Sequence, residues 1–170
     1  HISLTFLNPG DRVLVPELGY PSYKAVAEMV GATAIAYPIP EHLGYQPDLE
    51  QIKKMDLSDV KLLWLNYPNM PTGAPASRET FEGLIELAHE KRILLCHDNP
   101  YSLILNETDP VSLLAIEGAR DVAVELNSMS KSHNMAGWRI GWVSGAKAYI
   151  DEIVKIKSNV DSGMFKPVQM

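Results

Sequence analysis

Short apolar runs alternate with amphipathic stretches along the whole chain. The runs are bounded by turn residues and contain few charges, which is typical of strands buried on both faces of a sheet. The clearest amphipathic stretch covers residues 77–91, where Ser77 or Thr80 caps the start of a helix. The predicted strands cover residues 11–16, 32–37, 60–66, 92–97, 122–127 and 140–144. The predicted helices cover residues 20–30, 49–55, 77–91 and 147–157.

This repeated order of strand and helix predicts an α/β fold, with a mostly parallel sheet and helices on both of its faces. Open sheets of this kind bind ligands at the carboxyl ends of their strands, so the chemistry is expected just after residues 92–97 and 122–127. The proline-rich residues 38–44 are predicted to form a long surface loop. Trp138 and Trp142 alternate with polar residues as in a strand, which predicts that both pack in the core.

Composition narrows the class of protein without deciding the function. The chain has 170 residues, of which 46% are hydrophobic and 21% charged, so it is globular and sized for about one domain. The net charge of −6 gives no support for nucleic-acid binding, and no apolar run approaches the roughly 20 residues that span a bilayer. The single cysteine, Cys96, excludes a disulfide within the chain and favours a reducing compartment such as the cytoplasm. Asn106-Glu-Thr108 fits a glycosylation acceptor, a pattern that often arises by chance.

A lysine follows closely after the predicted strand 122–127. Lys131 is preceded by Ser128 and Ser130 and is followed by Arg139. An ordinary lysine, with a pKa of about 10.4, is a poor nucleophile at neutral pH, so carbonyl chemistry needs a site that favours its neutral form. The planar guanidinium of arginine and the hydroxyl groups suit a phosphate. We interpret Lys131 as a Schiff-base lysine beside a phosphate-binding site.

An acid and a tyrosine follow the predicted strand 92–97. Asp98, at the carboxyl end of that strand, can pair with a protonated pyridine nitrogen and keep the ring able to accept electrons. Tyr101 can donate a hydrogen bond to a hydroxyl of the same ring. His97 is interpreted as a group that supports Asp98 and not as a metal ligand, since no spacing of His and Cys predicts a metal site.

Five short motifs follow one another along the chain. They are Asn8-Pro-Gly-Asp11 with the strand after it, Gly19-Tyr-Pro-Ser-Tyr23, Asn66-Tyr-Pro-Asn-Met-Pro-Thr-Gly73, Asp98-Asn-Pro-Tyr101, and Ser128-Met-Ser-Lys131 with Arg139. In this order they resemble the class I/II aminotransferases, which are fold-type I enzymes that use pyridoxal 5'-phosphate (PLP). Each motif is weakly specific alone, but the set covers nearly the whole chain. Aspartate and LL-diaminopimelate aminotransferases are the nearest members that the resemblance suggests.

The resemblance implies a role for each matching residue. Lys131 forms the Schiff base with the cofactor and moves a proton between substrate and cofactor, while Asp98 holds the pyridinium. Tyr101 contacts the ring oxygen, and the ring of Tyr20 stacks on the face of the cofactor. The implied cofactor-binding residues are Lys131, Asp98, Tyr101, Ser128, Ser130, Arg139, Tyr20 and Asn69, of which Lys131 and Asp98 are also catalytic. No metal is implied.

The chain departs from the family pattern at one position. The family usually has asparagine directly before Pro71-Thr-Gly73, where the amide binds the ring oxygen, but this chain has Met70. A thioether is only a weak acceptor and cannot donate. Either Asn69 takes over this contact, or Tyr101 makes it alone.

Other interpretations stay open. PLP-dependent lyases and decarboxylases share these motifs, and so do non-catalytic PLP-binding sensor domains fused to DNA-binding modules. Ser128-Met-Ser-Lys131 also fits the S-x-x-K pattern of acyl-transferring serine enzymes, but their S-D-N and K-T-G companions do not occur in this chain.

The two ends of the chain look like cuts within a longer protein. His1-Ile-Ser has neither an initiator methionine nor the layout of a signal peptide, and Lys166-Pro-Val-Gln-Met170 carries no capping signal. We therefore expect residues 1–170 to be part of the large, PLP-binding domain, with a preceding segment and a small C-terminal domain outside this chain. The full protein is expected to be a homodimer that acts on amino-acid and 2-oxo-acid substrates, without nucleic-acid or membrane partners.

Overall fold

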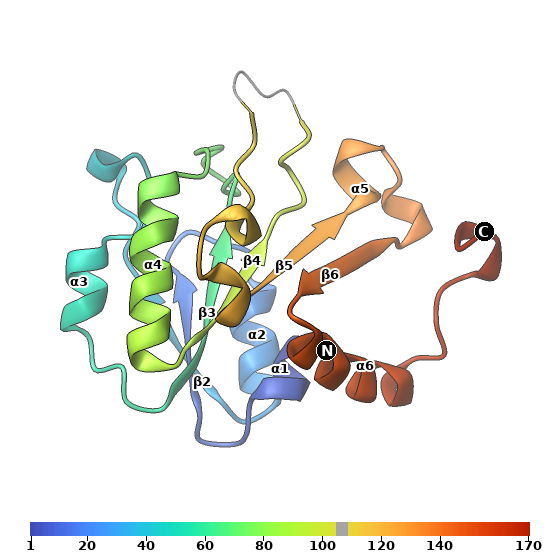
Figure 1. Cartoon of the computed structure of the whole chain (residues 1–170), viewed down its shortest axis with the longest axis horizontal. Coiled ribbons are helices and arrows are strands. Elements are labelled where there is room, and N and C mark those ends of the chain that lie inside the picture. The colour runs from blue at the N-terminus through green and yellow to red at the C-terminus, as the bar shows by residue number, and fades with distance from the viewer. Residues whose placement is uncertain (105–108) are drawn as a thin grey trace.

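A six-stranded sheet lies between two layers of helices in the computed structural model, which describes residues 1–104 and 109–170 (Figure 1). The strands are β1 (Arg12–Pro16), β2 (Thr33–Tyr37), β3 (Val60–Asn66), β4 (Leu94–Asp98), β5 (Ala123–Ser128) and β6 (Gly141–Gly145). The α-helices are α1 (Ile2–Phe6), α2 (Ser22–Met29), α3 (Leu49–Lys54), α4 (Arg78–Lys91), α5 (Met129–Ser132) and α6 (Lys147–Val160). Short 3₁₀ helices cover Glu41–Leu43, Leu113–Ala115, Ala119–Asp121, Ala136–Trp138 and Lys166–Val168. The Asn106-Glu-Thr108 pattern lies outside the described residues.

The strands occur in the spatial order β2-β1-β3-β4-β5-β6. Strands β1 to β5 are parallel and β6 runs antiparallel to β5, so the predicted α/β fold with a mostly parallel sheet is confirmed. The carboxyl ends of the parallel strands point to one edge of the sheet, the upper edge in Figure 1, and α5 follows directly beyond β5. Asn66 pairs with Asp98 and Asp98 pairs with Leu126, which brings the ends of β3, β4 and β5 into line.

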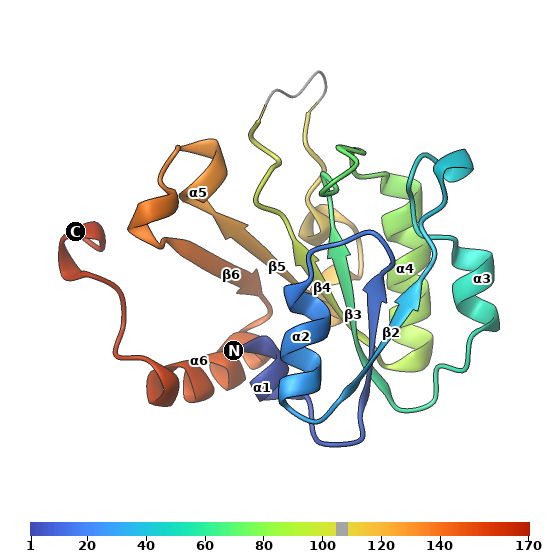
Figure 2. The ribbon, with the colours of Figure 1, turned by 180° about the vertical axis from the view of Figure 1, so that it is seen from behind.

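Alternate residues of the strands fill two apolar layers. One layer contains Leu63 and Leu95 and lies between the sheet and helices α3 and α4. The other contains Leu62 and Cys96 and is covered by α1, α2 and α6, of which α2 lies over the sheet in the view from behind (Figure 2). Neighbouring strand residues point to opposite faces, so one continuous apolar run supplies both layers.

Helix α4 has the cap and the apolar face that the sequence predicts. The Ser77 hydroxyl accepts a hydrogen bond of 3.3 Å from the Thr80 backbone N–H. Its buried face contains Phe81, Leu84, Ile85 and Ala88. The helix ends at Lys91 and is capped by Arg92, whose φ of 57° is in the left-handed region. Strand β4 begins at Leu94 and not at residue 92 as predicted.

The predicted core positions of two tryptophans are wrong. Trp138 is 56% exposed and Trp142 is 48% exposed. Trp138 lies in a 3₁₀ helix and Trp142 lies on β6, the last strand of the sheet. The strand predicted around Trp142 is present as β6. Because β6 is the edge strand of the sheet, the described residues leave the Trp142 side chain partly exposed. The predicted loop at residues 38–44 also differs, since it contains a short 3₁₀ helix at Glu41–Leu43.

Candidate functional site

Asp98 lies at the carboxyl end of β4 and is held by a tyrosine that the sequence analysis did not assign to the site. The Tyr23 hydroxyl, on α2, donates a hydrogen bond of 2.6 Å to the Asp98 carboxylate. The Tyr23 ring stacks on Trp64, with ring centroids 4.8 Å apart and an angle of 10° between the planes. Tyr20 meets Tyr23 edge to face at 6.1 Å. The predicted site residues Tyr20 and Asp98 are thus connected through Tyr23.

Burial and hydrogen bonding act in opposite directions on Asp98. Burial raises the pKa of its carboxyl group above the ordinary value, while the Tyr23 hydrogen bond and the charge of His97 partly offset this by favouring the ionised form. The pKa of Tyr23 is raised strongly by its own burial and by the adjacent Asp98 carboxylate. Tyr23 therefore remains a protonated donor, and Asp98 remains the acceptor of the pair.

Replacing Tyr23 with phenylalanine is expected to raise the pKa of Asp98 further. The variant keeps the stacked ring and the burial, but it removes the hydrogen bond that favours the carboxylate. The measurement is an NMR titration of the Asp98 side-chain carboxyl carbon. Tyr37→Phe is the matched control, since that buried hydroxyl donates to the Trp64 carbonyl and not to an acid. An unchanged Asp98 titration in Tyr23→Phe would show that this hydrogen bond does not stabilise the ionised form of Asp98.

Two asparagines fix the loop after β3. The Asn66 amide donates 3.0 Å to the Asp98 carbonyl and accepts 2.8 Å from the Met70 backbone N–H. Asn69 is buried, and its side-chain oxygen accepts a hydrogen bond of 2.7 Å from the Thr72 hydroxyl. In this arrangement the Asn69 amide stabilises its own loop, and the predicted contact with a cofactor stays a prediction.

Lys131 lies on α5, the short helix that follows β5. Its Nζ is 6.0 Å from the centroid of the Tyr101 ring, within reach of a cation–π contact. Tyr101 comes three residues after Asp98, which ends β4, and β4 and β5 are neighbours in the sheet. The structure therefore brings the predicted lysine and tyrosine together at the sheet edge where Asp98 ends its strand.

The two predicted phosphate-binding serines occupy the start of α5. The Ser128 hydroxyl caps the helix by accepting a hydrogen bond of 3.1 Å from the Ser130 N–H, and it donates 3.2 Å to the Ile140 carbonyl. Arg139 directly precedes Ile140, so its backbone lies next to Ser128. Its guanidinium donates 2.7 Å to the Ala136 carbonyl in the same turn. Ser128, Ser130 and Arg139 therefore lie in one corner of the molecule. The Arg139 side chain is directed toward its own loop.

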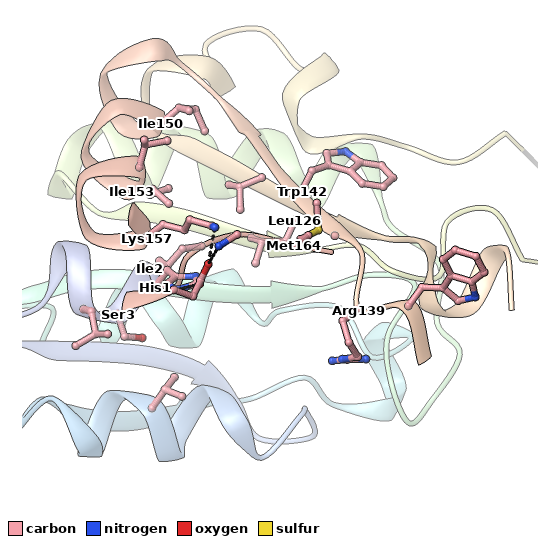
Figure 3. Close-up of a pocket in the computed structure, with 18 of the residues that line it drawn as sticks. His1, Ile2, Ser3, Leu126, Arg139, Trp142, Ile150, Ile153, Lys157 and Met164 are labelled. Atoms are coloured by element: carbon pink, nitrogen blue, oxygen red, sulfur yellow. Dashed lines mark hydrogen bonds and ion pairs between the residues drawn. The ribbon is translucent and has the colours of Figure 1, made fainter. Parts of the chain in front are cut away.

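A groove of about 1350 Å³ lies beside this corner (Figure 3). Arg139 and Trp142 line part of it, together with residues from α1, α2 and α6, from strands β3, β5 and β6, and from the segment that follows α6. Lys131, Asp98 and Tyr101 do not line this groove. The groove is therefore a feature separate from the edge where the predicted catalytic residues lie. Among residues 1–104 and 109–170 there is no cluster of three or more His, Cys, Asp or Glu side chains that would hold a metal.

A buried ion pair supports β4 and β5 behind the site. His97 is fully buried, and its Nδ1 lies 3.1 Å from the Glu125 carboxylate. Burial alone would raise the pKa of Glu125, but hydrogen bonds from His97, Ser112 and Asn99, together with the His97 charge, outweigh it and lower the pKa to about 2. Sequence reasoning missed Glu125, although an acid inside the apolar run 122–126 was a signal, since such a charge is rarely buried without a partner.

The Glu125 carboxylate is expected to make the protein sensitive to acid. Its folded pKa of about 2 lies below the unfolded value of about 4.5, so its contribution to stability is complete above the unfolded pKa and is lost as pH falls through the folded pKa. Glu125→Gln should flatten the fall of the unfolding free energy between these values, as measured by urea denaturation. Asp56→Asn is the control: the pKa of Asp56 is also about 2, held there by Ser58 and Arg12, but solvent screens this exposed acid. Equal effects of both substitutions would contradict the role given to burial.

Comparison with known proteins identifies the family. The model of the family described as "Aminotransferase class I and II" matches residues 1–169. The chain belongs to this family. An LL-diaminopimelate aminotransferase of Aquifex aeolicus is 42% identical over 170 residues, covering 99% of this chain and 44% of the relative. A second LL-diaminopimelate aminotransferase, from Gloeobacter violaceus, is 44% identical and is aligned over 98% of this chain and 43% of its own length.

Solved structures of aminotransferases have the same fold. A probable N-succinyldiaminopimelate aminotransferase from Thermus thermophilus superposes with a TM-score of 0.91 at 36% identity, covering 97% of this chain and 44% of that one. An aspartate aminotransferase from Thermus thermophilus with maleate gives 0.87 at 30% identity, over 94% of this chain and 41% of that one. PLP is the cofactor of the family, in agreement with the cofactor predicted from the sequence. The chain spans less than half the length of these relatives.

Proposed function

We propose that residues 1–170 form the cofactor-binding part of a PLP-dependent aminotransferase, which transfers an amino group between an amino acid and a 2-oxo acid. The observation that carries the proposal is the placement of two groups at one sheet edge: Asp98 with its Tyr23 partner at the end of β4, and Lys131 just beyond β5 with Tyr101 from the segment after β4. An acid, a primary amine and a phenol at this edge are a donor set that suits a phosphorylated pyridine aldehyde.

The side chains of the site divide the chemistry among them. PLP supplies an electrophilic carbonyl and a ring that accepts electrons. The Asp98 carboxylate would accept the hydrogen bond of the ring N–H, and the Tyr101 hydroxyl would donate to the ring oxygen. Lys131 Nζ would supply the amine that binds the carbonyl and, once the amine of the substrate has released it, the base for the proton at the substrate Cα.

The remaining predicted residues orient the cofactor. Ser128 and Ser130 supply hydroxyl groups and Arg139 a guanidinium for the phosphate, which requires Arg139 to turn away from the Ala136 carbonyl. Tyr20 is 51% exposed, which leaves its ring available to face the cofactor. The relatives named LL-diaminopimelate aminotransferase support that amino acid as the first donor to be tested.

We also propose that the chain is a part of the large domain, completed in the full protein by a preceding segment and a small C-terminal domain. The groove supports this proposal. Large apolar side chains that line it are exposed, among them Met29 and Trp142. Further polypeptide packed here would cover these apolar side chains.

Two finer proposals concern assembly and location. A homodimer is proposed because, in class I/II aminotransferases, residues of a second subunit commonly complete the cofactor site. A cytoplasmic location is supported by Cys96, a buried free thiol. No helix within the described parts of the chain is long and apolar enough to cross a membrane.

Borohydride reduction in the presence of PLP tests the central assignment. Reduction converts a lysine–PLP linkage into a stable pyridoxyl group, which peptide mass spectrometry locates. The expected result is one modified peptide carrying the group on Lys131. Lys147 and Lys157 are internal controls, because both are accessible lysines with acidic neighbours on α6. Modification spread over the control lysines, with none enriched on Lys131, would refute the proposal.

Product analysis separates aminotransferase activity from the alternatives of the same fold. With an amino-acid donor and 2-oxoglutarate, the full-length protein is expected to form the matching oxo acid and glutamate in equal amounts. Release of carbon dioxide or of an eliminated fragment would indicate a decarboxylase or a lyase. Cofactor binding without any product would indicate a sensor domain.

A further inference from the structure

Both ring nitrogens of His97 face hydrogen-bond acceptors. Nδ1 lies 3.1 Å from a Glu125 carboxylate oxygen, and Nε2 lies 2.9 Å from the Tyr67 carbonyl oxygen. A carbonyl oxygen can only accept, so Nε2 carries a hydrogen. His97 is 0% exposed, which leaves no water to share in these contacts from the protein surface. The protonation of Nδ1 then depends on the state of Glu125.

Glu125 is surrounded by donors. Besides His97, its carboxylate accepts hydrogen bonds of 3.2 Å from the Asn99 amide, 2.9 Å from the Ser112 hydroxyl and 2.8 Å from the Leu113 backbone N–H. The Asn99 amide nitrogen and the Leu113 N–H can only donate, and four donor groups converging on one carboxyl group favour its ionised form. Glu125 is therefore an anion, and Nδ1 of His97 donates to it. With hydrogens on both nitrogens, His97 is an imidazolium cation.

This buried cation is the immediate neighbour of Asp98 on β4. The two side chains point to opposite faces of the sheet: the His97 ring meets Phe81 of α4 at 5.0 Å, and the Asp98 carboxylate meets Tyr23 of α2. Among the described residues, Tyr23 and His97 act on the Asp98 carboxyl group, and Glu125, Asp98 and Tyr67 are the titratable residues next to His97. A charge enclosed in the core is screened far less than one in water.

We propose that His97 is a positioning residue: Glu125 and the Tyr67 carbonyl hold it as a cation, and its charge keeps the neighbouring Asp98 carboxylate ionised. His97 offsets the burial that would otherwise favour the neutral acid. The same three residues join β4 to β5 and to the loop after β3, so the charge is fixed in place by the strands that carry the site. The consequence for a bound pyridinium rests on the proposed function.

The first experiment uses the complete chain without cofactor. In the ¹⁵N spectrum of histidine-labelled protein, both ring nitrogens of His97 are expected at imidazolium shifts. In the variant H97N/E125Q, the Asp98 carboxyl carbon is expected to titrate at higher pH than in the wild type. The double substitution removes both charges together, so no unpaired charge is left in the core.

Phe81→Leu is the matched control. It disturbs the packing against the His97 ring but keeps both charges, so the Asp98 titration is expected to stay at the wild-type position. A purely structural role for His97 predicts equal shifts in the control and in H97N/E125Q. A neutral His97 ring in the wild type, or an unchanged Asp98 titration in H97N/E125Q, would overturn the proposal. H97N and E125Q, measured singly, are each expected to move the Asp98 titration in the same direction.

A second arm measures the dissociation constant of PLP by fluorescence, at mildly acidic and mildly alkaline pH. H97N/E125Q is expected to bind PLP about tenfold more weakly at acidic pH, a factor equivalent to one unit in pKa, and to approach the wild type at alkaline pH, where Asp98 is ionised in both. If Asp98 titrates as expected but PLP does not bind wild-type protein at either pH, the proposed function fails while the inference about His97 stands.

Discussion

Replacing Asp98 by alanine is expected to lower the turnover of the full-length protein by about two to three orders of magnitude. The substitution removes the charge that holds the ring nitrogen protonated, so the ring becomes a weaker electron acceptor when the substrate Cα loses its proton. The fold is expected to survive, because Asp98 is partly exposed and its hydrogen-bonding partner Tyr23 keeps its stacking on Trp64. The measurement is kcat for transamination, with circular dichroism as the check on folding.

One further variant separates charge from shape at this position, and a second serves as a control elsewhere in the chain. Asp98→Asn keeps the size of the side chain but removes its charge, and should be nearly as slow as Asp98→Ala. Asp56→Ala removes an acid that is exposed and paired with Arg12, far along the chain from the site, and should leave turnover unchanged. Turnover near the wild-type level in Asp98→Ala would rule out the assignment of Asp98.

Replacing Lys131 by alanine is expected to abolish measurable transamination. The variant loses the amine that binds the carbonyl and also the base that moves the Cα proton, and general acid–base catalysis alone contributes about 10²–10⁴-fold. Lys131 makes its cation–π contact with Tyr101 at the protein surface, so its loss should change stability little. Single-turnover absorbance changes with PLP and an amino-acid donor provide the measurement.

Lys131→Arg serves as the matched variant for this second prediction. Arginine keeps the positive charge beside Tyr101, but its guanidinium stays protonated and does not act as a base or a carbonyl nucleophile. We therefore expect Lys131→Arg to be as inactive as Lys131→Ala. Lys147→Ala, which removes an exposed lysine from α6, should behave as the wild type. An active arginine variant would show that Lys131 acts through its charge alone.

The sequence was sufficient for the sheet because its strands are buried on both faces. Such strands need an apolar residue at nearly every position, and runs such as residues 60–66 stand out from their polar surroundings. Once the strands are known to be parallel, Asp98 and Ser128 must end at the same edge. The position of the candidate site could therefore be predicted from the fold class together with the two short segments that begin at Asp98 and at Ser128.

Long-range contacts that no local pattern encodes could not be predicted. Tyr23 and Asp98 are 75 residues apart, and nothing in the helical pattern of α2 indicates that the hydroxyl reaches an acid at the end of β4. His97 and Glu125 are separated by 28 residues on adjacent strands. The tryptophan prediction failed for a related reason: alternation along β6 describes the strand, but exposure depends on what covers the edge of the sheet.

Strand β6 gives the chain a liability during recombinant production. Its sequence, Gly141-Trp-Val-Ser-Gly145, contains neither proline nor a charge, the devices that usually protect a sheet margin from pairing with another molecule. Backbone donors and acceptors along that margin, beside the aromatic ring of Trp142, form a template on which copies can stack into precipitates. Expression of residues 1–170 in isolation should therefore favour inclusion bodies, and Trp142→Lys should increase the yield of dispersed protein.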